Sequence, residues 1–177
     1  YADRVYLNAA PHYALRTLFD DQPALEPVRR KLERLAPSRS TTTVYLTTDV
    51  APAELGLAST ETMIVACGAD ASLAAREQAG IEATCEQAYW RDGVMEVTNY
   101  HALDPAGGRI VCLNVLDTIA HWPERRSVAY KFKKVRAREA LLERLYAAKP
   151  GLRGHVLTTE VATPRTYERF TNNTDGA

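Results

Sequence analysis

The chain has 177 residues, and its 22 Lys and Arg residues are balanced by 22 Asp and Glu residues, so the formal net charge is zero. With 46% hydrophobic and 25% charged residues it has the composition of a globular chain with one core, and it is neither disordered nor fibrous. The balanced charge excludes the long-range basic field expected of a nucleic-acid-binding protein, and no apolar run is long enough for a transmembrane helix.

The first half of the chain is predicted to contain three strands and two helices. An apolar strand is expected over residues 5–9. Apolar residues then recur at helical spacing over 23–37, which predicts an amphipathic helix. The β-branched and aromatic residues of 41–48 predict a second strand, and 61–67 has the composition of a third. A short alanine-rich helix is expected over 70–80.

The second half begins with a predicted hairpin. Two extended runs, 93–103 and 109–116, are joined by a segment whose Pro and Gly residues suit a turn. The pattern returns to helical over 127–148, and a further strand is predicted over 155–162. On the helix, the residues expected to form the apolar stripe are Val128, Phe132, Val135, Leu142 and Leu145.

A Thr-Pro pair marks the start of the last predicted helix, where Thr163 can cap the helix and Pro164 can occupy its first turn. Strands and helices interleave along the chain, but the hairpin and the adjacent strand runs favour pairing between sequence neighbours. We therefore expect an α+β fold, in which a mixed, largely antiparallel β-sheet is flanked by α-helices. Since no linker or repeat divides the chain, residues 1–177 are expected to form a single unit.

Most sequence signatures of known chemistry are missing. Neither nucleotide-binding fingerprint occurs, the nucleophile elbow of the hydrolases is absent, and the four histidines lie too far apart to predict a metal site from spacing. The three cysteines, Cys67, Cys85 and Cys112, are dispersed and odd in number, which is typical of reduced thiols in a cytosolic protein. The first residues lack the order of a signal peptide. The expected localisation is therefore cytoplasmic.

Two local features have more than one interpretation. The run 131–136 (KFKKVR) is the only concentrated basic patch, and it is either a solvated helix face or a contact with anionic lipid headgroups. The second interpretation implies a protein that is peripheral to a membrane. Trp122 is either a core or edge aromatic residue or part of the wall of an apolar substrate tunnel.

Three segments together resemble the phytoene desaturase and retinol saturase branch of the FAD-dependent amine-oxidase-like oxidoreductases. Residues 2–11 (ADRVYLNAAP) are similar to the family's A-D-x-V-(apolar)-x-N-A-x-P strand. Residues 104–109 (DPAGGR), with the strand that follows and Trp122, are similar to its D-P-x-x-x-P-x-G hairpin, although the second proline is missing here. Residues 160–177 are similar to its E-x-x-T-P-x-T-x-x-R-F/Y segment, which ends on Gly-Ala and is the most specific of the three.

In that family the substrate domain is inserted between two parts of a flavin-binding domain. The resemblance therefore implies that residues 1–177 are a single substrate-binding domain, that the flavin-binding flanks are absent from this chain, and that the chain alone would be inactive. The partner implied for it is the flavin domain of the same polypeptide. The implied reaction is hydride exchange between FAD and an apolar, polyene or lipid-like small molecule, in either direction.

The resemblance also implies site residues. Asn8 and Pro11, together with Thr163, Pro164 and Arg169, would pass near the flavin at the domain junction. For Arg169 two roles remain open, because it would either serve an anionic group or pair with Asp175.

Substrate contacts are expected from the walls of a sheet-lined apolar cavity, for which the candidates are Tyr45 and Trp122. No catalytic residue and no metal ligand is predicted, since the flavin would supply the redox chemistry. Two other functions compete with this one. The chain would then be a stand-alone module that binds an apolar ligand, or an interaction domain whose sheet packs on a partner.

Overall fold

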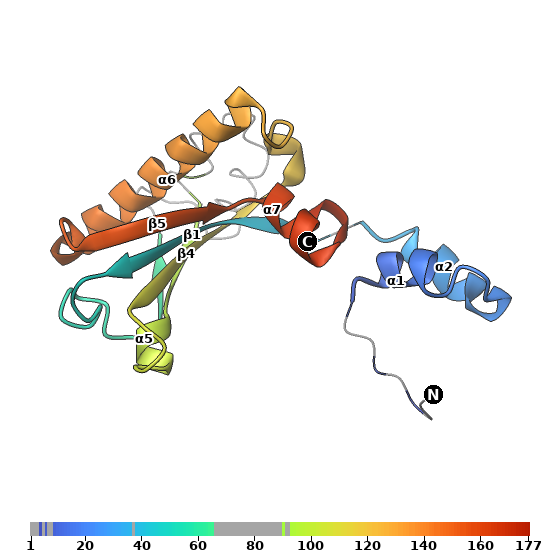
Figure 1. Ribbon diagram of the computed structural model, residues 1–177, viewed down its shortest axis with the longest axis horizontal. Helices are drawn as coiled ribbons and strands as arrows, with labels where there is room; N and C mark the ends of the chain where they lie inside the picture. Colours follow the sequence, from blue (N-terminus) through green and yellow to red (C-terminus); the bar gives the residue numbers. More distant parts are fainter. Residues whose placement is uncertain (1–3, 5, 7–8, 37, 66–89, 91–92) are drawn as a thin grey trace.

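The computed structural model describes residues 4, 6, 9–36, 38–65, 90 and 93–177 (Figure 1). The predicted helix over 70–80 and most of the predicted strand over 5–9 lie outside the described residues. Within the described ranges, no helix is both long and apolar enough to cross a lipid bilayer.

Five strands form one sheet, and every neighbouring pair in it is antiparallel. The strands lie in the order β2-β3-β4-β1-β5. Their bounds are Ser40–Thr48 for β1, Glu61–Ile64 for β2, Met95–Asn99 for β3, Ile110–Asp117 for β4 and Val156–Ala162 for β5. The predicted α+β class is confirmed, and the sheet is antiparallel throughout its described strands.

The predicted hairpin is confirmed in its pairing but not in its connection. Strands β3 and β4 pair with Val97 opposite Leu113. Between them, however, the chain forms a short helix, α5 (Tyr100–Leu103), where an extended run was predicted. The reason is local: the side chain of Asn99 accepts a hydrogen bond from the backbone N–H of Ala102, which caps a helical turn.

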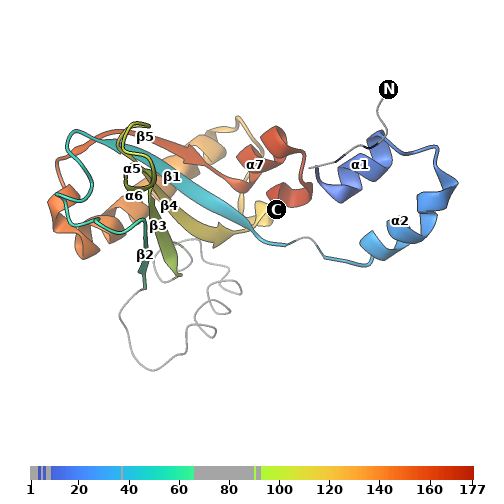
Figure 2. The same ribbon diagram turned by 90° about the horizontal axis from the view of Figure 1, so that it is seen from below.

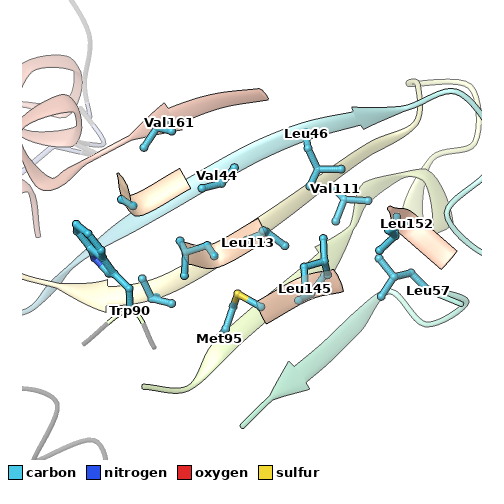
Figure 3. Close-up of a cluster of buried hydrophobic side chains, with 14 of the residues drawn as sticks. Val44, Leu46, Leu57, Trp90, Met95, Val111, Leu113, Leu145, Leu152 and Val161 are labelled. Carbon is cyan, nitrogen blue, oxygen red and sulfur yellow. The ribbon is translucent and has the colours of Figure 1, made fainter. Parts of the chain in front are cut away.

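Helix α6 (Val128–Ala148) covers one face of the sheet (Figures 1 and 2). The hydrophobic core lies between them, and in Figure 3 Val44, Leu46, Leu113 and Met95 of three strands gather with Leu145 of the helix. The 3-10 turn η3 (Pro150–Leu152) follows α6 and adds the buried Leu152. The helix therefore covers this face of the sheet and keeps water out of the core.

The buried face of α6 is not the one predicted. Val128 and Phe132 are 84% and 64% exposed, whereas Leu145 of the predicted stripe is buried. The actual inner face consists of Tyr130, Lys133, Ala137, Leu141 and Leu145. The two faces differ because Lys133 points inward although it is charged: its ammonium lies 5.2 Å from the ring centre of Trp122 and donates to the carbonyl of His121.

The N-terminal helices form an arm beside the end of the sheet (Figures 1 and 2). Helix α1 (Pro11–Thr17) is followed by the turn η1 (Pro23–Leu25) and by α2 (Glu26–Leu32), so the helix predicted over 23–37 is shorter than expected. The arm is held by its own contacts, such as the hydrogen bonds that the Arg29 guanidinium donates to backbone carbonyls after α1.

The second face of the sheet has no long helix across it among the described residues. It carries the alternate side chains of each strand, and three of these are exposed large apolar residues: Tyr45 (38%), Leu116 (39%) and Met63 (62%). At one end of the sheet lies α7 (Pro164–Thr171), which is followed by the short turn η4 (Thr174–Gly176). We call this surface the open face.

Candidate functional site

A groove of about 780 Å³ lies between the first turns of α6, the end of β5 and helix α7. Tyr45 reaches it from β1, and Tyr167, Arg169 and Phe170 line it from α7. The groove thus joins residues that are more than 120 positions apart in the sequence, including two that were predicted as site residues. We call it the α6–α7 groove.

Helix α7 begins at the Thr163-Pro164 pair, as the sequence predicted. The hydroxyl of Thr163 accepts a hydrogen bond from the backbone N–H of Thr166 at 3.3 Å, and Pro164 occupies the first turn. Thr163 is fully buried, and its Oγ1 lies 2.9 Å from the hydroxyl of Tyr130 on α6. The cap therefore holds α7 against α6 and determines where the groove residues of α7 lie.

A cluster of hydroxyl groups joins α7 to the open face. The Tyr167 hydroxyl lies 2.6 Å from Oγ1 of Thr43 and 3.3 Å from the hydroxyl of Tyr45. Thr43 in turn donates to Oδ1 of Asn114 at 2.8 Å. Partial burial, and then the hydrogen bond with Tyr167, raise the pKa of the Tyr45 phenol well above its ordinary value. The phenol is therefore neutral near pH 7 and remains able to donate a hydrogen bond.

Positive charge dominates the α6–α7 groove. Five cationic side chains line it against the single carboxylate of Glu160. The cationic residues are Arg125, Arg126, Lys131, Lys134 and Arg169. Of these, Lys134 lies 3.5 Å from Glu160, an exposed and weak ion pair.

Arg169 does not pair with Asp175 in the described part of the chain. Its guanidinium instead lies over the ring of Phe170, 4.9 Å from the ring centre, and both side chains line the groove. Asp175 belongs to the turn η4 and has a left-handed backbone, with φ of +57°. Of the two roles considered for Arg169, the pair with Asp175 is therefore not formed among the described residues.

Trp122 lies in the core. It is 2% exposed, its ring packs edge-on against Tyr130 with centres 5.7 Å apart, and its indole N–H donates to Oδ2 of Asp117 at 2.8 Å. It is not among the residues that line the α6–α7 groove. Of the two interpretations given to Trp122, this position favours the core aromatic.

The buried carboxylate of Asp117 organises that part of the core. It accepts hydrogen bonds from the Thr42 hydroxyl at 2.5 Å and from the backbone N–H of Thr118 at 2.7 Å, besides the bond from Trp122. Four donors are available to it when the ring of His121, at 3.1 Å, is included. A buried carboxylate with this many donors is a stable structural group, and it needs no ligand to compensate it.

The remaining predicted cofactor residues are placed elsewhere. Asn8 lies outside the described residues. Pro11 begins α1 in the N-terminal arm, where it is exposed and does not line the groove. The structure therefore brings together Tyr45, Arg169 and the Thr163 cap, but it does not bring Pro11 to them.

Residues that sequence reasoning missed make up most of the groove. Tyr167 was not singled out, although it joins α7 to β1, and Arg125 and Arg126 were not connected with the basic run on α6. The sequence does contain a signal that would have placed the two arginines near the basic run. They lie between the Trp122-Pro123 pair and the capping Ser127, next to the first turn of α6. Nothing in the sequence indicated that α7 would face them.

Other reactive groups are outside the groove. Burial raises the pKa of the Cys112 thiol to about 11, so this thiol is unreactive near neutral pH. Within the described ranges, no group of three or more His, Cys, Asp or Glu side chains is placed to hold a metal ion.

No protein-family model matches the chain, and no curated protein is significantly similar to it in sequence.

Proposed function

We propose that this chain is the substrate domain of an FAD-dependent oxidoreductase that resembles the phytoene desaturases. The enzyme would exchange a hydride between flavin and an apolar, polyene or lipid-like substrate. In this proposal the open face of the sheet forms one wall of the substrate cavity, and α7 lies on the flavin side of it.

The meeting of α7 with the open face is the observation that carries the proposal. By the family resemblance, Thr163, Pro164 and Arg169 belong to the flavin side and Tyr45 to the substrate side. These two groups were assigned from separate parts of the sequence, yet the Tyr167 hydroxyl of α7 lies 2.6 Å from Thr43 and 3.3 Å from Tyr45. A site in which substrate and cofactor must touch requires such a junction.

The exposed side chains of the open face support the same proposal. Tyr45, Leu116 and Met63 are exposed on it, and threonines and Asn114 lie among them. A face of this kind binds an apolar molecule by burying it, while a few hydroxyl groups orient it. In the proposed site Tyr45 and Tyr167 would orient the molecule, because both present phenol hydroxyls at the α7 end.

The groups beside α7 are compatible with a flavin. The guanidinium of Arg169, which contacts Phe170, and the phenol hydroxyls of Tyr45 and Tyr167 are donors suited to the polar edge of such a ring. Bound FAD would accept or release the hydride. The chain's own residues would bury the substrate, orient it and keep water from the reacting carbon.

The test is the flavin content of the protein encoded with its natural flanking sequence. We expect a yellow protein with a flavin absorption spectrum, and less bound flavin in an Arg169→Gln variant. Arg153→Gln is the matched control, because Arg153 is exposed and paired with Glu143, outside the α6–α7 groove. A colourless protein whose flanks include a complete flavin fingerprint would overturn the proposal, and so would a reading frame that encodes no such flanks.

A module that binds an apolar ligand without redox activity is the second candidate, and the same open face favours it. It predicts a colourless full-length protein that still binds a polyene. Retinol fluorescence provides the measurement, and a Tyr45→Ala variant should weaken the binding. A flavin-bearing protein would reject this candidate.

A further inference from the structure

We propose that the α6–α7 groove is a binding site for a phosphate ester. The proposal goes beyond the redox function, because it concerns the groove's own charge and would hold whether or not the protein carries a flavin.

The first support is uncompensated charge. In a chain with no net charge, five cationic side chains line one groove with one carboxylate. Among the described residues, Arg125, Arg126 and Lys131 form no ion pair and no side-chain hydrogen bond, and Arg169 only stacks on Phe170. Like charges repel each other when they are gathered in this way, so the arrangement costs stability in the free protein and a bound anion would relieve that cost.

The second support is backbone strain at one of the arginines. Arg126 has φ of +73°, a left-handed conformation that non-glycine residues seldom adopt. It lies directly before Ser127, whose hydroxyl accepts the N–H of Tyr130 at 3.1 Å to cap α6. The strained turn directs the chain so that Arg125 and Arg126 both line the groove. Strain of this kind is common where a binding site needs particular side chains in place.

The third support is the chemistry of the lining. The guanidinium groups of Arg125, Arg126 and Arg169 each offer forked N–H donors that match phosphate oxygens, and Lys131 adds a point charge. A phosphate monoester carries about two negative charges near neutral pH, more than a single carboxylate, so it compensates this excess of cations better. The groove volume of about 780 Å³ also leaves room for the organic part of an ester beside the buried Val161 and Ala162.

Only part of the basic run over residues 131–136 lines the groove. Lys131 and Lys134 line the groove, whereas Lys133 between them is buried against two tryptophan rings. The exposed Val128 and Phe132 lie on the same helix near these lysines. The phosphate can therefore come from a lipid headgroup or from a free ester, and the two sources predict different results.

Binding is measured first by titration calorimetry with inorganic pyrophosphate. We expect saturable binding that weakens as the salt concentration rises. In an Arg125→Gln/Lys131→Gln variant the dissociation constant should rise about tenfold or more, because charge-assisted hydrogen bonds are lost. The control is Arg136→Gln/Arg138→Gln, which also removes two positive charges, but from positions on α6 outside the groove. It should change the constant by no more than about twofold.

Vesicles distinguish the sources of the phosphate. If the ligand is a lipid headgroup, the protein should sediment with phosphatidylcholine vesicles that contain phosphatidic acid but not with pure phosphatidylcholine, and pyrophosphate should release it. If the ligand is a free ester, pyrophosphate binds and the vesicles do not. Absence of binding to both probes overturns the proposal. Equal weakening in the groove variant and the control variant also overturns it, because the general charge of the protein would then explain the binding.

Discussion

Gly176 shows how strongly a single residue is constrained where the backbone after α7 packs against Pro164 and Ser40. Its φ is +73°, and a Cβ at this position would lie 2.9 Å from the carbonyl carbon of Pro164 and 3.1 Å from Oγ of Ser40. Gly154 has a similar φ of +89°, but a Cβ there would have no neighbour within 4 Å. The two glycines therefore separate the cost of backbone strain from the cost of a steric clash.

We predict that Gly176→Ala lowers the free energy of unfolding by about 3 kcal/mol, because it adds a backbone clash to the strain of a left-handed alanine. Gly154→Ala, the matched control, should cost about 1 kcal/mol from strain alone. Urea unfolding followed by circular dichroism measures both values. Equal costs at the two positions would contradict the close approach of Gly176 to Pro164.

Cys112 gives a prediction about reactivity. Burial raises the pKa of its thiol from 9.0 to about 11, so near pH 8 the thiolate fraction should be about a hundredfold below that of an unperturbed thiol. In a Cys67→Ser/Cys85→Ser variant, alkylation of Cys112 by iodoacetamide should be slower by this factor in the native protein than in denaturant. The native rate should rise with pH until about pH 11. A native rate equal to the denatured rate would show that Cys112 is exposed.

At the scale of the element, α6 shows that the buried face of a helix need not be its most apolar face. Tyr130 and Lys133 occupy the inner face, while Val128 and Phe132 face outward. Lys133 is buried, and its ammonium lies beside the rings of both Trp90 and Trp122, at 5.6 and 5.2 Å from their centres. A charged residue can therefore contribute to the core when its head group has partners.

Two substitutions on α6 test this assignment. Leu141→Ala should lower the free energy of unfolding by about 3 kcal/mol, since Leu141 is fully buried and its loss leaves a cavity. Phe132→Ala removes a larger side chain, but it should change stability by no more than about 0.5 kcal/mol because Phe132 is 64% exposed. Urea unfolding of both variants is the measurement. A larger loss of stability in Phe132→Ala than in Leu141→Ala would instead support the apolar stripe predicted from the sequence.

At the scale of the whole molecule, the N-terminal arm and the sheet have separate contacts. The core cluster contains no residue before Val44, and the buried Ala14 and Leu15 lie within the arm. The arm's described side-chain hydrogen bonds, such as that between the ring of His12 and the carbonyl of Leu32 at 3.2 Å, stay inside it. The sheet with α6 and α7 is therefore expected to fold without the arm.

We predict that a chain starting at Ser38 keeps the unfolding free energy of the full chain to within about 1 kcal/mol, because the deletion removes no core contact. Circular dichroism should show the loss of helical signal from α1 and α2 only. Urea unfolding gives the stability. A shortened chain that is unfolded, or much less stable, would show that the arm packs on the sheet.

The sequence was sufficient where a structure depends on neighbouring residues. The β-branched run over 41–48 predicted β1, the Thr163-Pro164 pair predicted the cap of α7, and the turn residues between 103 and 109 predicted that β3 and β4 would pair. These are effects of local conformational preference and of short loops, which depend on residues close together in the sequence.

Only the tertiary structure decided which faces meet and where the site lies. It brought Tyr167 against Thr43, 124 positions apart, and it turned Lys133 inward although its charge suggested solvent. It also separated Tyr45, which reaches the groove, from Trp122, which lies in the core. The physical reason is that packing between distant segments depends on shape and on the partners available for each polar group, and neither is a property of a short stretch of sequence. The chain has no net charge, yet one of its grooves is positively charged. Folding brings cationic side chains from α6, from α7 and from the turn before α6 together around this groove.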